Sequence, residues 1–151
     1  MSDPRNFGLP HREPFVFVDE IFSVTEGEAQ CLKVFPPGDA MFRGHFPGNP
    51  IVPGVILTEA LAQTAGIAGT WTSPGRHFLL SAIRSMKFPA AARPGQRINL
   101  QARKTGEMGG LWMFDVRAEA DGTVVAVGQL VLNEAPPPPQ VEAGASANHT
   151  S

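Results

Sequence analysis

One stretch of the chain, from Val55 to Trp71, consists almost entirely of apolar or small residues and contains a single carboxylate, Glu59. Its length and composition predict a helix, and the lack of a broad polar face predicts that protein covers this helix on both sides. Removing an unpaired carboxylate from water costs several kcal/mol. We therefore expect Glu59 to be neutral, paired, or lining a cavity that a ligand enters.

A proline-rich segment, GHFPGNPIVPG at residues 44–54, leads into this helix and contains His45. Each of its three prolines fixes a backbone φ angle and lacks an N–H donor, so the loop can hold an imidazole in one place. Pro53 suits the first position of a helix, and Gly54 lets another group approach N–H groups that have no acceptor within the helix. Such amides can polarise a carbonyl group.

Extended segments are predicted on both sides of the helix. Residues 15–24 and 29–35 are rich in Phe, Val and Ile, and the Thr25-Glu26-Gly27-Glu28 sequence between them is typical of a hairpin turn. Four further segments are expected to be strands, and the third of them alternates clearly between apolar and polar residues: 78–88, 97–105, 111–120 and 123–132. Two strands, a long helix and four strands suit an antiparallel sheet with a helix on one face.

Length, charge and composition limit the number of domains and the kinds of function that this chain can have. A chain of 151 residues is long enough for one domain and too short to expect two. The net charge of −2 and the pI near 6.1 argue against a nucleic-acid binder. No apolar stretch approaches a membrane span, and without a secretory signal the expected compartment is the cytoplasm. The single cysteine, Cys31, lies in a predicted strand, where we expect a small buried side chain.

The C-terminal part has a different composition. Pro136–Pro139 is followed by small and polar residues without periodicity. We expect a single domain over residues 1–134 and a disordered proline-rich tail over residues 135–151.

Two blocks of the sequence are similar to a known family. LPHREPFVFVDEI at 9–21 and FRGHFPGNPIVPGVILTEALAQTAG at 42–66 resemble the FabZ-type 3-hydroxyacyl-acyl-carrier-protein dehydratases, and weaker similarity continues to about residue 134. The resemblance implies the hotdog fold, an α+β architecture in which an antiparallel β-sheet wraps around one long central apolar helix. It also implies a hydro-lyase that converts (3R)-3-hydroxyacyl thioesters on acyl carrier protein into trans-2-enoyl thioesters.

The resemblance assigns catalytic roles within the second block. Dehydration requires loss of the α-proton, departure of the 3-hydroxyl as water, and stabilisation of enolate-like charge on the thioester oxygen. By resemblance, His45 is the base that takes the proton, and Glu59 is the acid, directly or through a water. The carbonyl is expected at the N–H groups of Gly54 and Val55. Gln63, one turn after Glu59, is expected to orient its carboxyl, or else to be satisfied by the sheet backbone.

Partners also follow from the resemblance. Arg84, Lys87 and Arg93 fall in the region similar to the family's carrier-docking edge, although a solvated strand face explains these cations equally well. In the family, two subunits build each site together, which implies a homodimer or a multiple of one, with His45 of one chain facing Glu59 of the other. No metal-ligand spacing or phosphate loop is evident, and we expect no metal and no cofactor.

Two other functions fit part of the sequence. A hotdog thioesterase would use an acidic helix residue and water, without needing a histidine in the GHFPG loop. A non-catalytic acyl-binding hotdog protein would have no reason to keep both His45 and Glu59. The related FabA-type isomerases carry an aspartate in place of Glu59, which favours plain dehydration. Glu13, Arg93 and Gln96 depart from the family pattern, so acyl chain length and service in fatty-acid, polyketide or polyene synthesis stay open.

Overall fold

The computed structural model describes residue 3 and residues 15–44 and 48–135. The order of its elements is the predicted one, two strands before a helix and four after it: β1 (Glu20–Thr25), β2 (Glu28–Lys33), a short 3-10 helix (Ala40–Arg43), α1 (Gly54–Thr72), β3 (His77–Lys87), β4 (Ile98–Met108), β5 (Leu111–Ala120) and β6 (Thr123–Ala135). The proposed tail from residue 136 onward lies outside the described residues, and β6 extends to Ala135.

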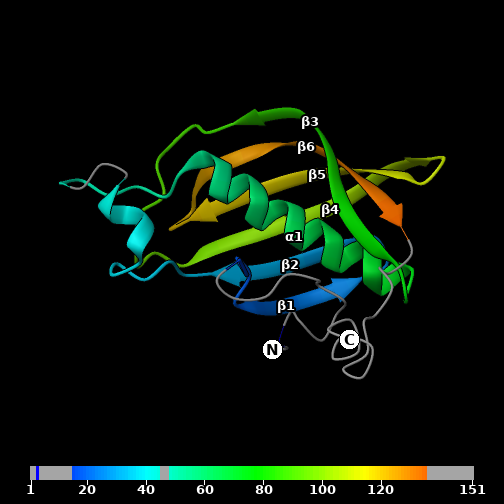
Figure 1. The fold of residues 1–151 in the computed structure, drawn as a ribbon, viewed down its shortest axis with the longest axis horizontal. Coiled ribbons are helices and arrows are strands. Elements are labelled where there is room, and N and C mark those ends of the chain that lie inside the picture. Colours follow the sequence, from blue (N-terminus) through cyan, green and yellow to red (C-terminus); the bar gives the residue numbers. More distant parts are fainter. Residues whose placement is uncertain (1–2, 4–14, 45–47, 136–151) are drawn as a thin grey trace, which may run out of the picture.

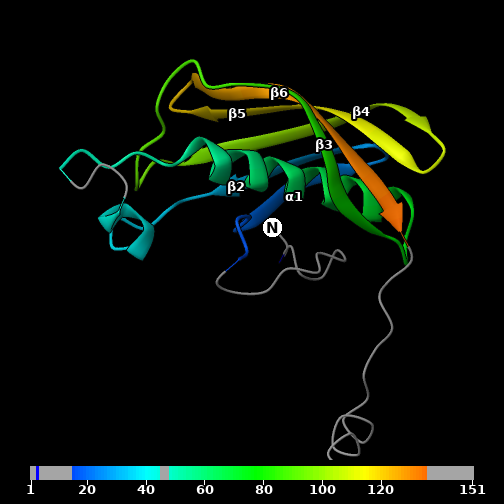
Figure 2. The same ribbon diagram turned by 45° about the horizontal axis from the view of Figure 1, so that its top comes forward.

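All six strands form one antiparallel sheet in the order β1-β2-β4-β5-β6-β3. Helix α1 lies across one face of this sheet (Figure 1). The turned view shows the sheet curving over the helix, with β1 and β3 at its two edges (Figure 2). This is the predicted architecture, an antiparallel sheet wrapped around one long helix.

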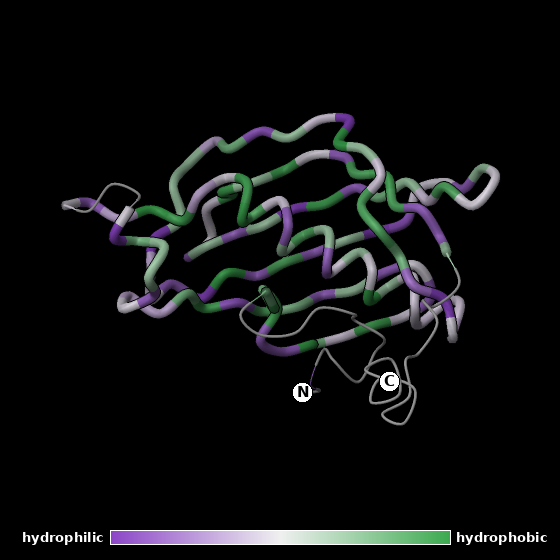
Figure 3. Tube along the Cα trace, viewed as in Figure 1, coloured by the Kyte–Doolittle hydropathy of each residue, from purple (hydrophilic) through white to green (hydrophobic). Residues whose placement is uncertain are grey.

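The core lies between α1 and the inner face of the sheet. The helix contributes side chains that are fully buried, among them Ala60, Leu61, Ala65, Ile67 and Ala68. The sheet meets them with large apolar side chains that are also fully buried, namely Leu100, Phe114 and Leu130. Hydrophobic and hydrophilic residues alternate along the strands (Figure 3), so that one face of the sheet is apolar. Burying each large apolar side chain contributes about 1.5–3 kcal/mol, which explains why the helix occupies this face.

The strand predicted over residues 15–24 begins later than expected. β1 starts at Glu20, and residues 15–19 are not part of the strand, although Asp19 N–H still donates to the Leu32 carbonyl at 2.8 Å. The N–H of Phe17 and the carbonyl of Phe15 bond instead to the side chain of Gln63 in α1. The prediction was wrong here because a tertiary contact takes the backbone groups that a strand neighbour would have used.

Strand β3 forms one edge of the sheet and pairs with β6. Its side chains are exposed on both faces from Leu79 to Ser85, and Leu79, Leu80 and Ile83 are 55%, 39% and 53% exposed. An exposed apolar edge strand is a template for pairing with another chain.

The last residues of β6 are anchored to the end of α1. Trp112 Nε1 donates to Glu134 Oε1 at 3.1 Å, and the Ser73 hydroxyl donates to Glu134 Oε2 at 3.1 Å. Arg76 adds an ion pair with the same carboxylate at 3.4 Å. These contacts explain why β6 continues past the predicted end at residue 132.

The described residues contain no helix with the length and hydropathy that a membrane span requires.

Candidate active site

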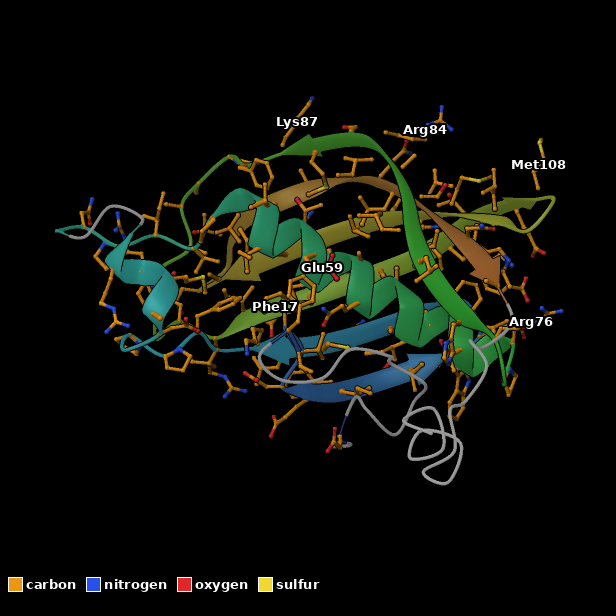
Figure 4. The ribbon with its side chains drawn as sticks, in the orientation of Figure 1. Phe17, Glu59, Arg76, Arg84, Lys87 and Met108 are labelled. Carbon is orange, nitrogen blue, oxygen red and sulfur yellow. The ribbon has the colours of Figure 1, made fainter. Side chains whose placement is uncertain are left out.

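Glu59 lies in the second turn of α1, near the centre of the molecule (Figure 4). Val55, Glu59 and Gln63 are spaced four residues apart, so they share one face of the helix. Along this face, exposure falls from 76% at Val55 through half-buried Glu59 to 2% at Gln63. The Glu59 carboxyl therefore sits between an open end of the helix and its buried interior.

Gln63 uses its whole amide group to fix the surroundings of Glu59. Its Nε2 donates to Glu59 Oε2 at 3.1 Å and to the Phe15 carbonyl at 3.1 Å. Its Oε1 accepts from the Phe17 N–H at 2.9 Å. Gln63 thus makes the predicted contact with the Glu59 carboxyl, and its backbone partners lie before β1 and not in the sheet, as the alternative had it. The partners at Phe15 and Phe17 were not foreseen, because residues 15–17 were expected to pair as a strand.

Replacing Gln63 with leucine is expected to lower both stability and activity. Leucine supplies an apolar side chain of similar size, but it leaves the Phe17 N–H and the Phe15 carbonyl without this partner. Each of these two partly buried hydrogen bonds contributes about 1 kcal/mol, so the free energy of unfolding should fall by about 2 kcal/mol. Urea denaturation measures this change. A Gln30→Leu variant, altered on the exposed face of β2, is the control and should unfold like the wild type.

The first turn of α1 presents backbone donors that no residue described by the structure uses. Pro53 is the N-cap and makes no side-chain cap hydrogen bond, and the first turn contains no acidic residue. Ile56 and Leu57 N–H groups donate to the Pro53 carbonyl at 3.0 and 3.1 Å. No oxygen of the described residues accepts a hydrogen bond from the N–H of Gly54 or Val55. These two amides, at the positive end of the helix dipole, can receive an oxygen that carries negative charge.

Gly54 lies close to the ring of Phe88, a residue that the sequence analysis did not single out. A Cβ atom at Gly54 would lie 3.0–3.1 Å from three ring atoms of Phe88. Phe88 follows β3 directly and is 46% exposed. A side chain at Gly54 would require the Phe88 ring to shift by a few tenths of an ångström, so glycine allows the closest approach of this ring to the start of the helix.

His45, the proposed base, lies outside the described residues. The described backbone resumes at Gly48, and Val52 N–H donates to the Ala92 carbonyl at 2.7 Å. The described part of the loop before α1 is therefore bonded to residues 88–97, the connection between β3 and β4.

The three cations predicted to dock a carrier occupy different settings. Arg84 and Lys87 project outward from the β3 edge, away from Glu59 (Figure 4). Arg93 lies in the connection between β3 and β4, and its Nη1 donates to Asn49 Oδ1 at 2.6 Å. Arg93 is therefore bonded to the loop before α1, a contact between positions 44 residues apart that no local pattern predicts.

Cys31 is a buried side chain in β2, as predicted. Burial raises the pKa of its thiol to about 12, and a side-chain hydrogen bond with Thr64 lowers it in part. A thiol with such a pKa is uncharged near neutral pH and is a poor nucleophile. Among the described residues, no group of three or more His, Cys, Asp and Glu side chains is arranged to hold a metal ion. The absence of a cofactor stays a prediction.

Solved structures share this fold. A dehydratase heterocomplex, ApeI:P from Xenorhabdus doucetiae, matches with a TM-score of 0.72 over 99% of this chain and 98% of that one, at 17% sequence identity. A hypothetical thioesterase with coenzyme A from Streptococcus pneumoniae matches with a TM-score of 0.63 over 78% of this chain and 85% of that one, at 14% identity. At these identities the likeness extends to the fold alone, which dehydratases and thioesterases share.

Sequence relatives show whether the chain belongs with the dehydratases or with the thioesterases. 3-Hydroxyacyl-[acyl-carrier-protein] dehydratase FabZ of Deinococcus radiodurans is 40% identical over 125 residues, covering 82% of this chain and 86% of its own. The enzyme of the same name from Thermotoga maritima is 39% identical over 124 residues, covering 82% of this chain and 90% of its own. The model of the FabA-like domain matches residues 9–129. The chain therefore belongs to the FabA-like domain family and, within it, to the FabZ-type dehydratases.

Proposed function

We propose that this chain dehydrates (3R)-3-hydroxyacyl thioesters on acyl carrier protein to trans-2-enoyl thioesters, in fatty-acid synthesis or a related polyketide or polyene pathway. The observation that carries the proposal is the placement of the Glu59 carboxyl. It is held by Gln63 on a helix that carries no other charged residue, one turn after Val55, whose N–H has no acceptor among the described residues. A single acid beside oxyanion donors suits the elimination of water from a thioester.

The reaction uses three groups, which the homodimer proposed below draws from both of its chains. His45 takes the proton from the carbon next to the carbonyl, and the electron pair moves toward the thioester oxygen. The N–H groups of Gly54 and Val55 stabilise the charge on this oxygen. Glu59 donates a proton to the 3-hydroxyl as its C–O bond breaks, so that water leaves and the new C=C bond forms. A proton then returns from His45 to Glu59, directly or through water, which restores the starting state.

The proposed assembly is a homodimer in which the two chains build each site together. The exposed edge strand β3 supports this, because its apolar side chains Leu79 and Ile83 are half exposed in one chain. Pairing two β3 edges would satisfy their backbone groups and bury these side chains. His45 of one chain would then face Glu59 of the other.

Arg84 and Lys87 are the proposed contacts for the carrier protein. Both project from the β3 edge into solvent. An acidic carrier would be steered toward them, with an effect mainly on the rate of association and its salt dependence.

The test is to incubate the purified full chain with a trans-2-enoyl thioester on carrier protein and to follow the acyl mass. The dehydration is reversible, so the expected result is a gain of one water. The same substrate with a His45→Ala variant should gain none, because the variant lacks the base that exchanges the α-proton. Loss of the acyl group would instead identify a thioesterase. An unchanged acyl mass across several chain lengths, with the protein folded, would leave an acyl-binding protein.

A further inference from the structure

Arg93 joins two connections that are distant in sequence. Its Nη1 donates to Asn49 Oδ1 at 2.6 Å and reaches the Pro50 carbonyl at 3.5 Å. Beside it, the Val52 N–H donates to the Ala92 carbonyl at 2.7 Å. The backbone immediately before α1 is thus attached to the connection between β3 and β4 through both side-chain and backbone contacts.

Arg93 is itself held in place from its other side. The backbone N–H of Arg93 donates to Gln96 Oε1 at 2.7 Å. Gln96 Nε2 in turn donates at 2.8 Å to Oδ2 of Asp121, in the turn between β5 and β6. The Gly95 N–H donates to the Phe35 carbonyl at 2.8 Å, and Gly95 has a positive φ of 86° that suits glycine. The guanidinium therefore projects from a turn that is bonded to the segment after β2 and to the turn between β5 and β6.

We infer that Arg93 is a positioning residue, which sets the path of the chain between His45 and the first turn of α1. This inference rests on the proposed function and adds a residue to it. Asn49 follows His45 by four positions and precedes Gly54 by five. Asn49 and Pro50 lead directly into the oxyanion donors, and in the proposed function they also follow the base closely in the chain. Small misplacements of such groups lower rates by up to about a hundredfold.

The alternative role of Arg93 is carrier docking, and the two roles predict different kinetics. A docking residue matters only for substrate on the carrier protein and acts on KM. A positioning residue matters equally for a small thioester without a carrier, and it acts on kcat. Arg93 and Gln96 are the two positions in this turn that depart from the family pattern, and the structure shows them bonded to one another through the Arg93 N–H and Gln96 Oε1.

The experiment compares Arg93→Met with Arg93→Lys on the same enoyl group carried by the protein carrier and by N-acetylcysteamine. Methionine keeps an unbranched side chain without hydrogen-bond donors, and lysine restores a positively charged donor group. We expect Arg93→Met to lower kcat/KM about tenfold on both substrates, with kcat falling and KM nearly unchanged on the carrier. Arg93→Lys should recover part of the loss. Arg103→Met, on the exposed face of β4, is the matched control and should leave the rates on both substrates unchanged.

A double-mutant cycle with Asn49→Ala tests the contact itself. If Arg93 acts through Asn49, the double variant should be no slower than the slower single variant. Additive losses, a loss confined to the carrier substrate, or no loss would each overturn the inference. Hydrogen exchange of the amides of residues 48–56 supplies a readout besides activity, and Arg93→Met should speed exchange there. A wild type inactive on both substrates would defeat the proposed function, whereas unchanged exchange in Arg93→Met would defeat the inference alone.

Discussion

Replacing Glu59 with glutamine is expected to lower kcat by about 10²–10⁴-fold while the chain stays folded. The amide has nearly the shape of the carboxyl but carries no acidic proton for the leaving hydroxyl. It can still offer its oxygen to Gln63 Nε2, which bonds the Glu59 carboxyl at 3.1 Å. The free energy of unfolding should therefore change little. Stopped assays of enoyl hydration and urea denaturation measure the two quantities separately.

A matched carboxylate on the sheet gives the control. Glu119 in β5 pairs with Arg117 at 2.6 Å, and its side chain is 31% exposed. An ion pair of this kind contributes little, so Glu119→Gln should keep a kcat within about twofold of the wild type. If Glu59→Gln keeps more than about a tenth of wild-type kcat, Glu59 is not the acid, and its contact with Gln63 has a structural role only.

The sequence predicts the helix and the order of strands because both depend on local patterns. The apolar run after the proline-rich loop marks α1, and the alternation from Leu111 to Ala120 marks β5 with its buried face. The contact between Glu59 and Gln63 was also predictable, because residues four apart share one face of a helix. These features require no knowledge of what lies across the sheet.

Contacts between distant segments are what the sequence does not reveal. Residues 15–19 have the composition of a strand, yet the backbone of Phe15 and Phe17 bonds to a glutamine more than 45 positions away. The packing of Phe88 against Gly54 and the bond from Arg93 to Asn49 are equally invisible, since nothing local marks them. All three lie around the start and the middle of α1, where the proposed chemistry takes place.

The exposure of the side chains of strand β3 also could not be predicted from the sequence. Its composition predicted a strand correctly, but its side chains are exposed on both faces over much of its length. The strand pairs with β6 through two irregularities, between Leu80 and Ala82 and between Ile83 and Ser85. Such bulges bend a strand and change which side chains face the core. The pairing brings the backbone of β3 unusually close to Gly128 in β6.

Replacing Gly128 with alanine is expected to lower the free energy of unfolding by about 3 kcal/mol, a large effect for one added methyl group. A Cβ atom there would overlap the Ser85 carbonyl and lie 2.6 Å from Met86 Sδ. The obstacle includes backbone of the paired strand, so relief requires β3 to move away from β6. Because β3 is also the proposed dimer edge, the dimer should weaken with it. Urea denaturation and analytical ultracentrifugation measure the two effects.

Gly38→Ala is the matched control for Gly128→Ala. A Cβ atom at Gly38 would meet no atom within 4 Å, so its stability should stay within about 0.5 kcal/mol of the wild type. Hydrogen exchange then locates the damage: in Gly128→Ala, amides of β3 should exchange faster, whereas those of β4 and β5 should keep their protection. Equal stability of the two variants would mean that β3 tolerates a side chain at Gly128. The close approach at Ser85 would then not constrain this edge of the sheet.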